Sequence, residues 1–125
     1  MPDLKEDKQK YLGMYLDMLQ YIHTKYPMYK LNIAIPTYYP PQIVIEMSKY
    51  VDKIYLMAYE FKNIAQLIRK VNKYSMLSSK LITVFNCKEF KNEYQLEMAI
   101  DQFIKQSGYK DIALHNLKEY IKVSQ

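Results

Sequence analysis

Tyr59 and Glu60 stand side by side at the end of an apolar run, VDKIYLMAYEF, at residues 51–61. A carboxylate at a partly dry strand end can act as a general acid or base, or can orient a substrate group. We interpret the pair as candidate catalytic residues. Two alternatives stay open: Glu60 as a surface glutamate, and Tyr59, which alternates with Met57 and Tyr55, as packing inside a barrel.

Three other apolar runs also end on polar or aromatic side chains, in the segments Pro36-Thr37-Tyr38-Tyr39, Asn86-Cys87-Lys88-Glu89 and His115-Asn116. The carboxyl ends of parallel strands meet at one edge of a sheet, where ligands bind. We therefore expect a substrate-binding rim made of Tyr38, Met57, Asn86, His115 and Asn116. Ordinary turn chemistry is the alternative explanation for polar strand ends.

The opposite strand ends carry a different set of side chains, which we interpret as solvating charges: Lys30, Asp52, Lys53, Lys80, Lys110 and Asp111. The asymmetry favours a cleft at the carboxyl ends. His115 has no flanking acid to orient it, so a structural histidine is the alternative to a catalytic one.

No metal or cofactor is expected. His115, Glu60 and Glu89 could bind a metal in principle, but they lack a ligand-spacing signature. The single cysteine, Cys87, excludes an intramolecular disulfide, and we interpret it as a small buried hydrophobe. With two glycines in the chain, a Gly-rich phosphate loop is excluded.

The elements that must position these residues follow from two alternating hydrophobic periods. Helical spacing predicts helices at 6–26, 40–51, 63–77, 92–108 and, less clearly marked, 117–123. Short β-branched runs predict strands at 31–36, 52–61, 80–86 and 111–116. Asn63 and Asn92 are placed to cap helices, and Gly108 to end one.

The order α-β-α-β-α-β-α-β, with nearly continuously apolar strands, is typical of parallel strands buried on both faces and joined by helical crossovers. Repeats of about 25 to 30 residues match the βα unit of a (β/α)₈ barrel. We therefore predict an α/β fold in which residues 1–125 form a single partial-barrel domain, half of a TIM barrel. An open flavodoxin-like sheet, typical of a regulatory domain, is the alternative.

Composition limits the classes of binding partner that we expect. The formal charge is +5, but the lysines are spread among acids and Arg69 is the one arginine, so no nucleic-acid partner is expected. The fourteen tyrosines could stack on bases, yet most fall at apolar-periodic positions typical of a core. No apolar run has the length of a membrane span, so no membrane partner is expected. We expect a soluble chain of unknown compartment, compatible with secretion after removal of a signal segment.

One motif resembles a known family. The segment from Asp52 to Glu60 has the spacing D-x-x-x-x-M-x-Y-E, in which Met57 and Tyr59 are the middle residues. This spacing is similar to the D-x-x-x-x-M-x-Y-D signature on the sixth strand of glycoside hydrolase family 18, the chitinase-like proteins. The runs LNIAIPTYYP, KLITVFN and DIALHN resemble the fifth, seventh and eighth strands. The resemblance covers nearly the whole chain as the C-terminal half of that barrel.

The resemblance implies that Tyr59 and Glu60 hold the N-acetyl group of a carbohydrate during substrate-assisted cleavage, with Met57 lining the floor. Glutamate in place of aspartate moves the carboxylate by one methylene. The family's acid motif, D-x-x-D-x-D-x-E, is lacking, because PDLKED has a different spacing, and the chain has no tryptophan. We expect a glycosidase-like fragment that binds a carbohydrate and is inactive alone; a non-catalytic glycan- or protein-binding module is the alternative.

A half-barrel leaves two strand edges and an apolar inner face uncovered. We therefore expect a homo-oligomer, such as a dimer or a swapped assembly, or an N-terminal half-barrel to cover them.

Overall fold

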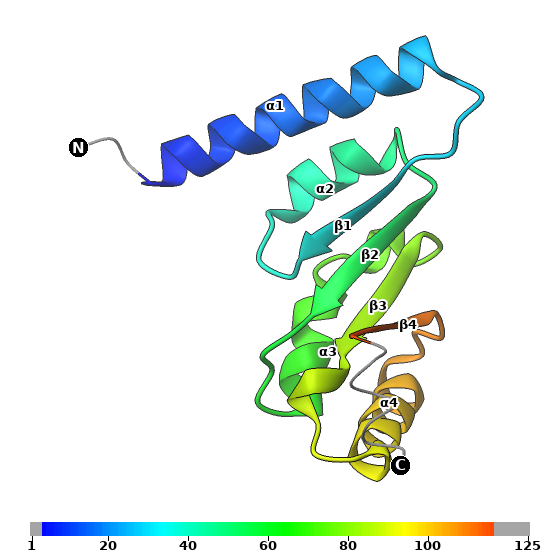
Figure 1. Ribbon diagram of the computed structural model, residues 1–125. Helices are drawn as coiled ribbons and strands as arrows, with labels where there is room; N and C mark the ends of the chain where they lie inside the picture. The colour runs from blue at the N-terminus through cyan, green and yellow to red at the C-terminus, as the bar shows by residue number, and fades with distance from the viewer. Residues whose placement is uncertain (1–3, 117–125) are drawn as a thin grey trace.

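The computed structural model describes residues 4–116 of the chain (Figure 1). The elements are α1 (Leu4–Lys25), β1 (Asn32–Pro36), α2 (Pro41–Ser48), β2 (Lys53–Ala58), α3 (Ile64–Asn72), the 3₁₀ turn η1 (Ser75–Leu77), β3 (Leu81–Asn86), the 3₁₀ turn η2 (Cys87–Glu89), α4 (Glu93–Ser107) and β4 (Ile112–His115). This order confirms the predicted alternation of helices and strands. The helix expected at 117–123 lies outside the described residues.

The four strands form one parallel sheet in the order β1-β2-β3-β4. Each strand thus lies beside the one that precedes it in the chain, in a half-barrel-like arrangement. A flavodoxin-like sheet would instead reverse its strand order at a switch point, so that alternative is wrong. Successive right-handed crossovers in one direction place their helices on the same face of the sheet.

Burial along the strands shows which face the helices cover. Side chains on one face are buried, among them Ile35, Leu56 and Phe85, and they belong to the same core cluster as Leu67 of α3 and Phe103 of α4. The other face, here called the open face, is half-buried or exposed except at Val84, and it consists of Ala34, Pro36, Tyr55, Met57, Ile82, Val84 and Ala113. The expectation of strands buried on both faces is therefore wrong for residues 4–116, in which no second layer covers the open face.

The helix ends follow the predicted signals. The Asn63 side chain accepts a hydrogen bond from the main-chain N–H of Gln66 at 2.8 Å, and Asn92 does the same for Gln95 at 2.9 Å. Gly108 ends α4 in the left-handed region, at φ 81°, where a side chain would be strained. The two asparagines therefore fix where α3 and α4 begin, and Gly108 fixes where the chain leaves α4 and turns toward β4.

α1 lies beyond β1 and packs against α2 (Figure 1). Leu12 and Leu19 are buried, whereas Tyr11 and Tyr15 are 72% and 37% exposed. Together with three further exposed residues they form the α1 stripe: Tyr11, Met14, Tyr15, Met18 and Tyr21. No helix within residues 4–116 is both long enough and apolar enough to cross a membrane.

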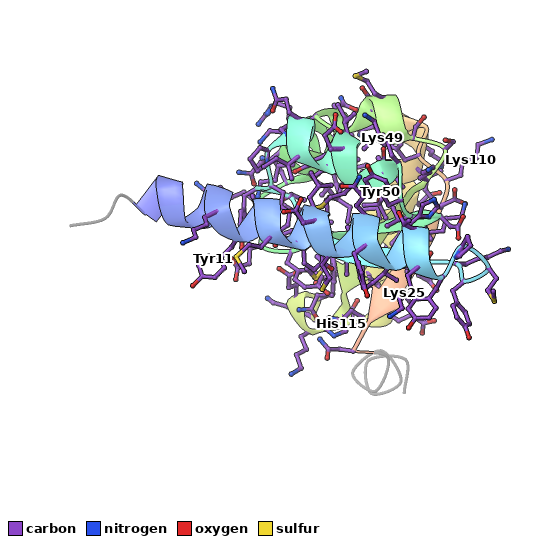
Figure 2. All side chains as sticks on the ribbon, turned by 90° about the horizontal axis from the view of Figure 1, so that it is seen from above. Tyr11, Lys25, Lys49, Tyr50, Lys110 and His115 are labelled. Atoms are coloured by element: carbon purple, nitrogen blue, oxygen red, sulfur yellow. The ribbon has the colours of Figure 1, made fainter. Side chains whose placement is uncertain are left out.

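Seen from above, Tyr11 and Lys25 project to the side of α1 on which His115 lies, while Lys49 and Tyr50 lie on the other side (Figure 2). Tyr21 belongs to the first side, because Lys25 contacts its hydroxyl at 3.1 Å. Among the tyrosines that the structure describes, seven are at least 37% exposed, Tyr74 is fully buried, and the other five are half-buried, so the expected place at the core or its margin holds for only part of them.

Candidate functional site

The carboxyl ends of β2 and β4 meet over the end of β3. The Tyr59 hydroxyl and Nδ1 of His115 are 2.5 Å apart, and the two rings are stacked with centroids 5.7 Å apart. Tyr59 directly follows β2 and His115 ends β4, while Asn86 of β3 pairs with His115 in the sheet register. The open face brings the two rings together because all three residues project from it.

Burial raises the pKa of the Tyr59 phenol, and the negative charge of Glu89 raises it further. The phenol therefore keeps its proton at neutral pH and can donate a hydrogen bond to Nδ1 of His115. The tautomer that accepts this bond carries its N–H at Nε2. The exposed His115 ring thus offers a hydrogen-bond donor to a ligand.

Two amides extend the network next to this pair. Asn116 donates from Nδ2 to Oδ1 of Asn86 at 2.6 Å, and the same oxygen accepts the main-chain N–H of Lys88 at 3.1 Å. Asn116 has φ 62°, a left-handed conformation that asparagine tolerates. The bond therefore holds the chain after β4 against the end of β3.

Glu60 and Glu89 connect β2 to β3 at the same rim. The main-chain N–H of Glu60 donates to Oε1 of Glu89. Glu60 itself has φ 59°, which is uncommon for a glutamate, and its side chain is exposed. The exposure favours the alternative of a surface glutamate at Glu60. Glu89, considered from sequence only as a metal ligand, is instead the acceptor that fixes the turn after β2.

The remaining predicted site residues border this network. Met57 lies on the open face two residues before Tyr59, beside Pro36 and Val84 in the register. Tyr38 follows β1, is 72% exposed, and meets the ring of Tyr39 edge-on. The structure thus forms two adjacent hydrogen-bonded pairs, Tyr59 with His115 and Asn86 with Asn116, and leaves Met57 and Tyr38 at the margin.

Sequence reasoning missed Tyr74, which supports the rim from below. Its buried hydroxyl lies 2.6 Å from the carbonyl of Tyr39 and 3.1 Å from that of Thr37, a donor shared between two acceptors. Burial raises the pKa of Tyr74 to about 12. No motif marks this residue, because its partners are main-chain atoms 35 and 37 residues away.

The amino ends of the strands differ from the expectation of plain solvating charges. The Lys80 ammonium donates to the carbonyls of Ser48 and Val51 at 2.6 and 2.9 Å, so it satisfies orphan acceptors after α2. Lys80 also lines a cleft of about 320 Å³, together with His23, Pro27, Met28, Tyr29, Lys30, Leu31, Lys49, Tyr50, Val51 and Asp52. The interpretation of Lys80 as a solvating charge is wrong.

Cys87 is fully buried, as expected, and burial raises the pKa of its thiol. In the part of the chain that the structure describes, no three His, Cys, Asp or Glu side chains are placed to hold a metal ion. The rim therefore consists of hydroxyl, imidazole, amide and carboxylate groups next to an apolar sheet face.

Comparison with known proteins leaves the family open. No model of a known protein family, no curated protein and no solved structure matches the chain. The resemblance to glycoside hydrolase family 18 remains a prediction from sequence.

Proposed function

We propose that the chain binds a carbohydrate, with an N-acetyl group as its recognised substituent, at the rim formed by the carboxyl ends of β2, β3 and β4. The observation that supports this is the network of two adjacent hydrogen-bonded pairs, Tyr59 with His115 and Asn86 with Asn116, which the register places side by side. Sugars present closely spaced hydroxyls and an amide, which need several fixed donors and acceptors in one place. The network supplies them from three adjacent strands.

The apolar surroundings of the network suit the rest of a sugar. Tyr59 and His115 present stacked rings, and Met57 lies beneath them on the open face. Aromatic and apolar side chains with a few convergent polar groups are the usual lining of small-molecule sites. In this proposal the N-acetyl methyl group contacts Met57, and the amide and ring hydroxyls bond the rim.

We propose binding without cleavage by this chain alone. General-acid catalysis needs a carboxyl group that keeps its proton until the glycosidic oxygen takes it, which usually requires dry surroundings. Both rim carboxylates, Glu60 and Glu89, are exposed, and Glu89 already accepts the N–H of Glu60. Their role in the proposal is to shape the rim.

A calorimetric or NMR titration with chitin oligosaccharides tests the proposal. Tyr59→Phe removes the hydroxyl from the network and should weaken binding by roughly fivefold, the effect of one hydrogen bond of about 1 kcal/mol. Tyr29→Phe is the matched control, because Tyr29 lines the cleft at the opposite strand ends and is 64% exposed.

Oligosaccharides of glucose should bind more weakly than chitin oligosaccharides of equal length, because they lack the N-acetyl group. Absence of any binding at millimolar sugar, or equal weakening by the two phenylalanine variants, would contradict the proposed site. Release of new reducing ends by the isolated chain would contradict the absence of cleavage.

A further inference from the structure

We infer that a second copy of this chain closes the half-barrel into an eight-stranded barrel, with β4 of each copy beside β1 of the other. The two-fold axis would run along the barrel, so both sets of rim residues would surround one mouth. The inference does not depend on the nature of the ligand. Three features of the structure support it: strand stagger, the open face and the two ends of the sheet.

The strand stagger matches that of a closed eight-stranded barrel. Ile112, the first residue of β4, aligns with Thr83, which aligns with Leu56 and then with Ile35. Ile35 lies three residues after Asn32, the first residue of β1, so three steps across the sheet shift the strand start by three residues. One residue per strand gives a total of about eight residues around eight strands, the shear of a (β/α)₈ barrel.

The same stagger predicts the register at the new seam. One further step after β4 gives a shift of four residues from Asn32, which is the level of Pro36, Met57, Val84 and Ala113. Ala113 would therefore face Asn32 of the second copy, and His115 would face its Ala34. Since the shift is even, side chains of the open face point into the barrel in both copies.

The open face has the composition of a barrel interior. Layers of apolar, often branched side chains fill the interior of (β/α)₈ barrels. The middle of the open face offers Tyr55, Met57, Ile82 and Val84, with the smaller Ala34 and Ala113 toward the two seams. A second copy would cover this face with an identical set.

Apolar side chains at the two ends of the sheet are exposed and would meet across the seam. α1 lies beyond the β1 edge, and Tyr11 of the α1 stripe projects to the side of α1 on which His115 lies (Figure 2). At the β4 end, Leu114 is 37% exposed, and Tyr94 and Met98 on α4 are 69% and 53% exposed. Pairing β4 with β1 of the second copy places these two patches over the same seam, and two-fold symmetry repeats the contact.

The closed barrel would complete the mouth. In one copy the rim covers the ends of four strands, with His115 and Asn116 at its outer edge. At the seam these residues would meet β1 of the second copy and the loop that carries Tyr38. Tyr38, which stands at the margin of the network in one copy, would then border the same cavity as His115 of the other.

Sedimentation velocity and thiol cross-linking test the inference together. In a Cys87→Ala background, the double variant Asn32→Cys/Ala113→Cys should form a covalent dimer on mild oxidation or with a short thiol cross-linker. Neither single variant should form a covalent dimer, because the two copies of any one position lie at different seams of the barrel. The unmodified chain should sediment as a dimer at micromolar concentration.

A matched pair of charge substitutions tests the α1 stripe. Met14→Asp places a carboxylate in the seam and should weaken dimerisation by roughly tenfold or more, as for charges buried in interfaces. Met76→Asp makes the same change in η1, where Met76 is 81% exposed, and should have no effect. A monomer at about 100 μM, a dimer that the double variant does not cross-link, or cross-linking by a single variant would overturn the inference.

Discussion

At the residue scale, two non-glycine residues of the described chain have a positive φ, Glu60 and Asn116, and both lie in the rim. They directly follow the ends of β2 and β4 across which Tyr59 and His115 meet. A left-handed conformation costs a residue with a β-carbon roughly 1–2 kcal/mol, less for asparagine. Glu60 bears this cost while its N–H is held by Glu89, so local stability is given up at the predicted site.

Replacing Glu60 by glycine should remove that strain. Glu60→Gly is expected to raise the free energy of unfolding by about 0.5–1 kcal/mol, the relief of φ strain less the greater chain entropy of glycine. Urea unfolding measures the change. Glu60→Ala keeps a β-carbon and is the control: stabilisation of equal size in this variant would show that the carboxylate, and not the backbone, carries the cost.

Sequence marked Tyr59, Asn86, His115 and Asn116 through their places at strand ends, and the structure brings them together. It could not show that Glu89 accepts the Glu60 N–H, because this bond joins residues 29 positions apart through a turn geometry that no spacing rule encodes. It also left open whether Glu60 is a surface glutamate, and the structure shows that this residue is exposed.

At the element scale, boundaries were predictable where a local cap fixes them. Asn63, Asn92 and Gly108 act within one helical turn, so their signals lie in adjacent residues. α1 was harder, because it carries apolar residues on two sides. Periodicity identified a helix but could not tell which stripe faces α2, since that depends on packing between elements.

Tyr74 links two elements, the segment after α3 and the loop after β1. Its folded-state pKa, about 12, lies above the ordinary 10.0, so folding favours the protonated phenol. The resulting stability is fully present below pH 10.0 and is lost as the pH rises toward 12. Burial of the phenolate would be unfavourable, which fixes the sign.

Tyr74→Phe should therefore lower the free energy of unfolding by about 1–3 kcal/mol at neutral pH, because two carbonyls lose their donor. The difference between the two proteins should shrink between pH 10.0 and about 12. Chemical unfolding of both proteins should be measured across that pH range. The difference between them isolates the contribution of Tyr74, because both proteins carry the same lysines. A constant difference would contradict the assignment.

At the scale of the whole molecule, the half-barrel was predictable from four βα units of similar length. Whether the second face of the sheet is covered was not predictable. An apolar strand has the same sequence whether that face is covered within the chain or by a partner. The strand order distinguishes the half-barrel from the flavodoxin-like sheet. It depends on the direction of each crossover, which the hydrophobic periodicity of the sequence does not encode.

A barrel completed by two copies makes unfolding depend on concentration. The temperature midpoint of unfolding should rise when the protein concentration is raised a hundredfold, because dissociation accompanies unfolding. Met14→Asp should reduce that rise and Met76→Asp should keep it, as measured by circular dichroism. A midpoint independent of concentration in the unmodified chain would be the contrary result.

The chain order of the strands also bears on how such a protein can change in evolution. Because β1 to β4 follow one another with the same crossover, each βα unit adds to a free edge without disturbing the strands already paired. Duplication, fusion or loss of whole units therefore keeps the remaining units compatible with the same architecture. A gene that encodes four units can double within one reading frame, after which its two halves are free to diverge.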